Sequence, residues 1–170
     1  VRDLKREANV EVKGSERDLT PTISESSVLI DLPLPAYLPT DYIEEIALRL
    51  QLYRRIGGLN TVDEVKTMRE ELKDRFGALP AAVEGLLYQM QVKLLAQDAN
   101  ASAILHREEV AEVRLPYLVE LDRPRLERGI GSGVRVTRTA VELPMTDGWQ
   151  ERLLAVLVYL ATNVKLAVGI

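Results

Sequence analysis

The amino-acid sequence predicts an α+β domain: a helical half of three helices, then a small, mostly antiparallel sheet and a closing C-terminal helix. Two observations support this prediction. Apolar residues recur every three or four positions between residues 43 and 95, as in amphipathic helices, whereas after Asn100 short segments alternate with a period of two, as in strands. Glycine, proline and capping residues stand between these segments, where helices and strands are expected to end.

The first 26 residues are predicted to be a linker. Residues 13–26 are polar and mixed in charge, and they contain no aromatic residue. Such a composition buries too little apolar surface to offset the entropy lost on ordering. Residues 1–7 are compatible with one or two helical turns, as at the end of a preceding helix. We therefore expect a linker with a helix remnant over 1–26 and a single domain over 27–170.

The domain is expected to begin with an apolar, β-branched run at residues 28–34, which Pro33 and Pro35 restrict to an edge strand or an extended arm. A helix is predicted to follow, with Thr40 or Asp41 as its N-cap and Gly57-Gly58 at its end. The residues expected on its buried face share one helical spacing: Ile43, Ile46, Ala47, Leu50 and Tyr53.

The second and third helices have clear boundaries. Thr61 and Glu64 form a capping box, and Gly77 is a natural end for the helix that follows. Its predicted buried stripe is Val65, Met68, Leu72 and Phe76. Pro80 is expected in the first turn of the third helix. The core face of that helix is predicted to be Val83, Leu86, Leu87, Met90, Leu94 and Leu95.

The second half is predicted to contain the sheet. Strands are expected at residues 103–106, 110–115, 134–138 and 141–143, with a short capped helix at 122–128 and a turn at 131–133. The closing helix is predicted to run from Trp149 to Asn163, with Thr146 or Asp147 as its cap.

Composition argues against most catalytic chemistry. The 170 residues have a net charge of −4 and include no cysteine and one histidine, which excludes disulfides, thiol nucleophiles and multi-histidine metal sites. His106 stands alone beside charged residues and is predicted to be a surface histidine. The glycines at 129–133 precede a strand rather than a helix, so they indicate a turn and not a phosphate-binding loop. The apolar run at 153–164 is shorter than the roughly 20 residues that cross a bilayer.

One stretch, residues 121–140, is locally positive, with five arginines against two acidic residues. Two interpretations of this cluster stay open: a solvated face, or a surface that contacts nucleic-acid phosphates. No stacking aromatic residue lies within the stretch. Its members are Arg123, Arg125, Arg128, Arg135 and Arg138.

Three motifs in the helical half resemble one known family. They are LPLPAYLPTDYI at residues 32–43, RLQLYRRI at 49–56 and ELKDRFGALP at 71–80. Together they look like the C-terminal domain of the bacterial transcription-repair coupling factor, Mfd. Residues 1–5 look like the end of the last helix of the preceding motor domain, so the resemblance covers nearly the whole chain and is weakest after Asn100.

The resemblance implies a regulatory role. The family's full-length protein is a cytoplasmic bacterial DNA translocase that uses ATP and magnesium, displaces stalled RNA polymerase and recruits the damage sensor UvrA for nucleotide excision repair. Its C-terminal domain is not an enzyme and holds no cofactor. In the family, this domain packs on the N-terminal UvrB-like module of the same chain, masks the UvrA-binding surface and restrains activity until it is displaced.

The same resemblance suggests interface residues. The acidic residues that contact the UvrB-like module in the family match Glu71 and Asp74 here. Three residues apart on a helix, these carboxylates are expected on one exposed face. Local pairing with Lys73 or Arg75 is the competing interpretation. The competing function is an accessory DNA-contacting module that uses the arginines of residues 123–138.

Overall fold

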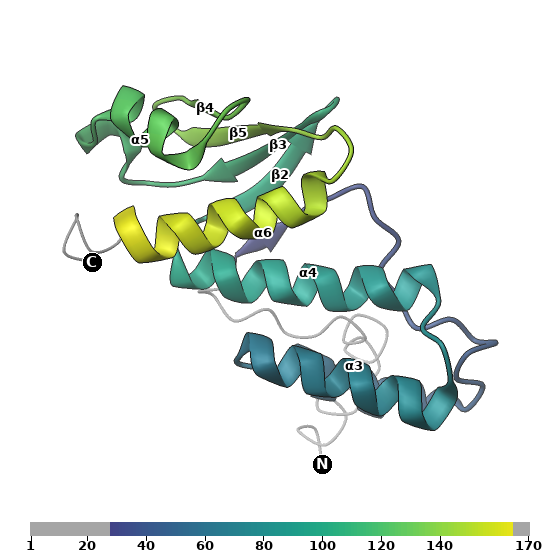
Figure 1. Cartoon of the computed structure of the whole chain (residues 1–170). Coiled ribbons are helices and arrows are strands. Elements are labelled where there is room, and N and C mark those ends of the chain that lie inside the picture. Colours follow the sequence, from purple (N-terminus) through teal and green to yellow (C-terminus); the bar gives the residue numbers. More distant parts are fainter. Residues whose placement is uncertain (1–27, 165–170) are drawn as a thin grey trace, which may run out of the picture.

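The computed structural model describes residues 28–164 and confirms the α+β class. The predicted linker over residues 1–26 lies outside the described residues. In Figure 1 the elements form stacked layers: the sheet with α5 lies at one end, α6 packs under the sheet, α4 under α6, and α3 at the other end. The helical half and the sheet half therefore meet along α4 and α6.

The described helices follow the predicted order. They are α2 (Ile46–Gly57), α3 (Val62–Phe76), α4 (Ala81–Asp98), α5 (Arg123–Ile130) and α6 (Trp149–Tyr159), with a 3₁₀ turn η1 (Leu118–Glu120) and a π-helical turn η2 (Leu160–Val164). The strands are β1 (Leu29–Ile30), β2 (Ala103–Arg107), β3 (Val110–Arg114), β4 (Arg135–Val136) and β5 (Ala140–Pro144).

The sheet is mostly antiparallel, as predicted. Its strand order is β1-β2-β3-β5-β4, and only the pairing of β1 with β2 is parallel among the described strands. Strand β1 lies at the edge of the sheet, where Pro33 was expected to confine it. It is shorter than the apolar run that predicted it, because the prolines that follow cannot donate to a ladder.

Two apolar cores lie on opposite sides of α4. Val83 and Leu87 belong to the core formed with α2 and α3, whereas Val92 and Ala96 belong to the core formed with the sheet and α6. The predicted core face of α4 covered mainly the first of these sides, and only Leu95 among its members packs against the second core. The buried residues that the prediction missed on the second side, Val92, Ala96 and Ala99, are small and give a weaker apolar signal than leucine or methionine. Burial on both sides makes α4 the common wall of the domain.

Helix α2 begins later than predicted. Thr40 and Asp41 lie in a turn, and Ile46 is the first helical residue, with Glu45 as the N-cap. Neither predicted cap is therefore used. The turn is closed by the carbonyl of Pro39, which accepts hydrogen bonds from the amides of Tyr42 and Ile43.

The predicted buried face of this segment is wrong for Ile46, Ala47 and Leu50, whereas Ile43 is buried and Tyr53 packs against the core. Ile46 is 66 % exposed and Leu50 is 37 % exposed, whereas Leu52 and Ile56 are buried. Apolar residues occur on almost every side of this helix, so the period alone was compatible with more than one buried face. Packing against the neighbouring helices selects one of them and leaves an apolar stripe in contact with solvent.

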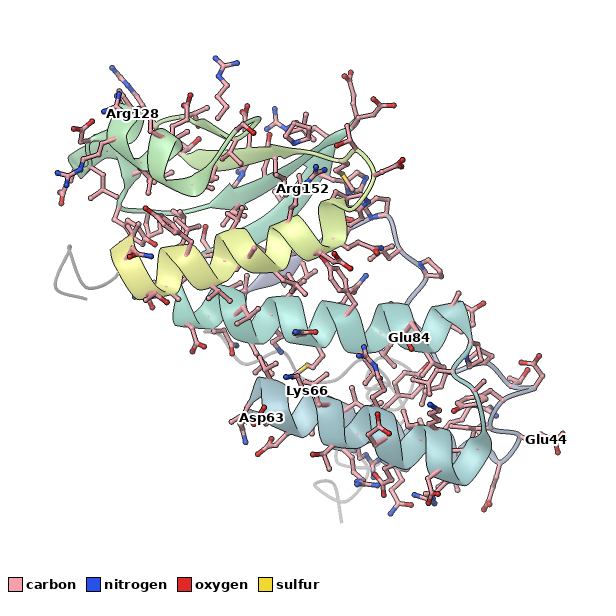
Figure 2. All side chains as sticks on the ribbon, viewed as in Figure 1. Glu44, Asp63, Lys66, Glu84, Arg128 and Arg152 are labelled. Carbon is pink, nitrogen blue, oxygen red and sulfur yellow. The ribbon has the colours of Figure 1, made fainter. Side chains whose placement is uncertain are left out.

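The start of the closing helix corrects another prediction. Gly148, at φ +77°, is the N-cap of α6, and neither Thr146 nor Asp147 caps it. The side chain of Thr146 instead accepts a hydrogen bond from the guanidinium of Arg152 at 2.6 Å. Figure 2 shows Arg152 at this end of α6 beside the turn from β5. Regular helix ends at Tyr159 and continues as the π-helical turn to Val164.

Helix α4 approaches the chain before α2 very closely. Pro80 precedes its first turn as the N-cap rather than lying within it. One turn later, a Cβ at Gly85 would lie 1.9 Å from the backbone oxygen of Pro35. Only glycine permits this contact, which brings the segment after β1 against α4.

Candidate interaction surfaces

The described residues contain no assembled catalytic or metal centre. In residues 28–164, no three His, Asp or Glu side chains are grouped so that they could hold a metal ion. None of the described helices is both long enough and apolar enough to span a bilayer. His106 is partly buried rather than fully solvated, and its Nδ1 lies 2.9 Å from the backbone oxygen of Asp31, which ties β2 to the residue after β1. The candidate sites are therefore surfaces.

Helix α3 carries the first surface and is firmly placed. Thr61 Oγ1 accepts from the amide of Glu64 at 3.1 Å, and the Glu64 carboxylate accepts from the amide of Asn60 at 2.7 Å. The predicted capping box is thus confirmed, with the return bond made one residue before the cap. At the other end, Tyr42 Oη lies 3.1 Å from the carbonyl oxygen of Leu72 and 3.0 Å from that of Gly77.

Glu71 is engaged with the fold. Its two carboxylate oxygens lie 3.0 and 2.6 Å from Nη1 and Nη2 of Arg55 on α2, and Arg75 approaches at 3.5 Å. The hydrogen bonds from Arg55 hold the pKa of Glu71 below its ordinary value, although partial desolvation opposes them. The predicted local partner Arg75 is present, and Arg55 is a closer one that no helical spacing could reveal. Glu71 therefore clamps α3 to α2.

Asp74 is differently placed. Its side chain is exposed and makes no ion pair within the described part of the chain. Asp63 and Glu70 precede it by eleven and four residues, close to three turns and one turn of helix, so the three carboxylates follow one line on the solvent side of α3. Asp63 and Glu70 are also exposed, and neither forms an ion pair among residues 28–164. Figure 2 shows Asp63 at one end of α3.

We call Asp63, Glu70 and Asp74 the acidic row. The two predicted interface residues lie on the same helix, but the structure assigns them different surroundings: Glu71 is paired with α2 and Asp74 faces solvent. Asp63 and Glu70 were not predicted. Both signals that would have found them were present in the sequence: their spacing from Asp74, and the predicted buried stripe on the opposite side of the helix.

The second surface is the arginine cluster. Arg123, Arg125 and Arg128 lie on α5, Arg135 on β4 and Arg138 just after it. The fold brings these elements together through Glu127, whose carboxylate accepts from the amide of Val136 at 3.0 Å. Except for the half-buried Arg123, the arginines are exposed. We call this cluster the basic face; Figure 2 shows its member Arg128 on α5.

The acidic residues within the basic face form no ion pair with its arginines in the described part of the chain. Asp122 caps α5 by accepting from the amide of Arg125 at 3.2 Å, and Glu127 is held by β4. None of the five arginines forms an ion pair within the described residues, whereas Arg55, Arg69 and Arg114 elsewhere each have a carboxylate partner. The basic face and the acidic row lie at opposite ends of the stack of layers in Figure 1.

Comparison with known proteins identifies the family. The family model of the TRCF domain matches residues 32–122, which is more than half of the chain. The chain belongs to the TRCF domain family. The matched region contains all three motifs from which the resemblance was inferred, so that inference is confirmed.

Relatives of this TRCF domain are much longer proteins. The transcription-repair-coupling factor of Mycobacterium tuberculosis is 36 % identical over 121 residues, which cover 69 % of this chain and 10 % of the relative. That of Rickettsia conorii is 41 % identical over 86 residues, which cover 51 % of this chain and 7 % of the relative. This chain thus spans about a tenth of the length of the curated relatives that it matches.

A solved structure supports the fold. The crystal structure of the C-terminal domain of a transcription-repair coupling factor superposes with a TM-score of 0.68 at 17 % identity, covering 84 % of this chain and 96 % of that chain. At this identity the likeness establishes a common fold. It confirms the helical half, the small sheet and the closing helix as those of a TRCF C-terminal domain.

Proposed function

We propose that this TRCF domain is a non-enzymatic regulatory domain of a transcription-repair coupling factor. In this role it packs on the N-terminal UvrB-like module of the same protein and masks the surface that binds UvrA. Displacement of the domain then exposes that surface and releases the restraint on the translocase. Family membership supports the assignment of the domain to a transcription-repair coupling factor. The acidic row supports a charged contact with the UvrB-like module.

The observation that carries the proposal is the exposure of Asp74 within a line of carboxylates that lack ion-pair partners in the described residues. Such a line complements a basic surface, and complementary charge gives register and specificity to an interface. The clamp between Glu71 and Arg55 holds α3 in position beneath it. In this proposal Asp74 makes the contact, and Glu71 positions the helix that carries it.

The mechanism is a population shift. A covalently attached domain is present at high effective concentration, so a weak contact is enough to keep a binding site covered. A contact worth about 3 kcal/mol would reduce the apparent affinity for UvrA roughly a hundredfold. Loss of part of this contact should therefore appear as tighter binding of UvrA by the full-length protein.

Charge reversal of the acidic row tests this proposal. We expect Asp74→Arg in the full-length factor to raise UvrA affinity by about tenfold, because a repelled domain masks the site for less of the time. Adding Glu71→Arg should raise it further by also breaking the clamp. The matched control is Glu120→Arg, which reverses an exposed carboxylate on η1. Equal UvrA affinity for the wild type and Asp74→Arg, measured by surface plasmon resonance, would sink the proposal.

The basic face supports a second candidate function, an accessory contact to DNA. The observation behind it is that the five arginines have no ion-pair partner in the described residues, while Asp122 and Glu127 are occupied by backbone amides. Guanidinium groups in this state can replace the counterions of a phosphate backbone. Without stacking aromatic residues, such binding would follow the backbone and not the base sequence.

Salt dependence separates the two functions. If the basic face contacts DNA, the affinity of the chain for a mixed-sequence duplex should fall steeply with salt. In a plot of the logarithm of the binding constant against the logarithm of the salt concentration, each contacted phosphate contributes about −0.9 to the slope. Replacing Arg125 and Arg128 by alanine should then make this slope less steep by the contribution of about two phosphate contacts. Replacing Lys66 and Lys73 on α3 is the control for lost charge. No binding at low salt would contradict the DNA contact and leave the regulatory role.

A further inference from the structure

The solvent-facing side of α2 leads into an apolar groove. The groove lies between α2, α4 and β1, has a volume of about 400 Å³, and is lined by Leu29, Ile30, Tyr53, Leu86, Met90 and Lys93, among others. Leu50 and Ile46 continue it along α2 from the groove-lining Gly57, at spacings of seven and four residues, so the three follow one side of that helix. From Ile46 to Gly57 this surface is about 16 Å long.

This surface is unusually apolar for one exposed to solvent. Leu29 is 60 % exposed and Ile46 is 66 % exposed, although both are large aliphatic residues next to a groove. On most protein surfaces, exposed apolar residues are scattered singly. A contiguous exposed apolar surface instead marks a site of interaction. The sequence period had in fact predicted Ile46 and Leu50 as core residues. In the described part of the chain Ile46 is mostly exposed, and Leu50 is partly exposed.

Two basic residues lie in or beside the groove. Lys93 is the charged residue among the groove-lining side chains, and Arg54 follows Leu50 by one helical turn. Neither forms an ion pair within residues 28–164. A ligand that fills this surface would therefore meet an apolar strip with cations at its edges.

We propose that the groove between α2, α4 and β1, together with the apolar stripe of α2, binds an amphipathic helix of a partner protein that carries carboxylates beside its apolar face. The length of the stripe favours a helix over a small amphiphile, since the contact continues from Tyr53 to Ile46, about two helical turns beyond the groove. Apolar side chains of the partner occupy the groove, and its carboxylates pair with Lys93 and Arg54. Interfaces of this form place apolar anchors at their centre and charge at their rim.

This surface is separate from the one proposed to mask the UvrA site. Arg55, which holds Glu71, is nine residues from Ile46, and nine residues are two and a half helical turns. The two residues therefore point to opposite sides of α2. A TRCF domain could hold the acidic row against one partner while the groove accepts another.

A designed peptide is the probe. The probe is a fluorescein-labelled synthetic helix with leucines at i, i+4 and i+7, flanked by glutamates. The control is a second peptide of the same design in which lysines replace the glutamates. In fluorescence anisotropy we expect the 170-residue chain to bind the glutamate peptide more tightly than the lysine peptide. Leu50→Glu should weaken binding of the glutamate peptide by at least about tenfold. Val158→Glu, which changes a half-exposed apolar residue on α6, should leave binding unchanged.

A charge exchange distinguishes contact from structural damage. Lys93→Glu should weaken binding of the glutamate peptide and strengthen binding of the lysine peptide. A misfolded groove would not produce this exchange of preference. Equal affinity for the two peptides, or full binding by Leu50→Glu, would overturn the proposal. No binding would also overturn it, as expected if the chain's own first 27 residues or a second copy of the chain fill the groove. Sedimentation of the free protein as a dimer, reversed by Leu50→Glu, would assign the groove to that second copy.

Discussion

Gly85→Ala is expected to destabilise the domain by about 2 kcal/mol or more, although alanine is normally the better residue inside a helix. The added Cβ would lie 1.9 Å from the backbone oxygen of Pro35, so either α4 or the segment after β1 must move. Overpacking of this kind costs roughly 1–3 kcal/mol, and more where backbone is displaced. The gain in helix propensity, about 1 kcal/mol, offsets only part of it. Urea unfolding at equilibrium measures the difference.

Gly129→Ala is the matched control. Gly129 also lies in a helix, α5, and a Cβ there would approach a neighbour, the hydroxyl of Tyr159 at 2.2 Å. That hydroxyl is the end of a rotatable side chain, so a small rotation relieves the contact. We expect a loss below about 1 kcal/mol, or none, because the propensity gain compensates. Equal losses at the two glycines would contradict the close approach of α4 to Pro35.

Leu52→Ala is expected to cost about 2–5 kcal/mol, because Leu52 is fully buried between α2 and its neighbours and its truncation leaves a cavity. Leu50→Ala, two residues away on the same helix, should cost less than about 1 kcal/mol, since Leu50 is 37 % exposed. The pair of urea unfolding curves tests which face of α2 is buried. A loss for Leu50→Ala as large as that for Leu52→Ala would restore the face predicted from the sequence.

The elements that the sequence predicted well have strong local signals. Thr61 and Gly77 bound α3 as expected, because a hydroxyl cap and a residue at φ +88° act within one turn of their own positions. The buried stripe of α3 was also correct, since nearly all of the other positions of this helix are charged and do not compete for burial. The short helix after Asp122 was predicted on similar local grounds.

The elements that were mispredicted depend on neighbours. Helix α2 has apolar residues on several sides, so the choice of Leu52 over Leu50 required α3 and α4 to be in place. Gly148 replaced Thr146 at the start of α6 because the Thr146 side chain accepts from Arg152 instead. The candidate sites follow the same rule. Glu71 could be identified as a member of an acidic segment, but its partner Arg55 is sixteen residues away on another helix.

The sequence by itself determined the α+β class, the order of its elements and, through the motifs between residues 32 and 80, the TRCF family. These properties depend on periodicity, capping and residue identity, which are local. Tertiary structure alone decided that α4 is buried on both sides, that Glu71 pairs with Arg55, and that α2 exposes an apolar stripe beside a groove. Such choices are made by packing, because an apolar or charged side chain reaches its final environment only when the other elements supply it.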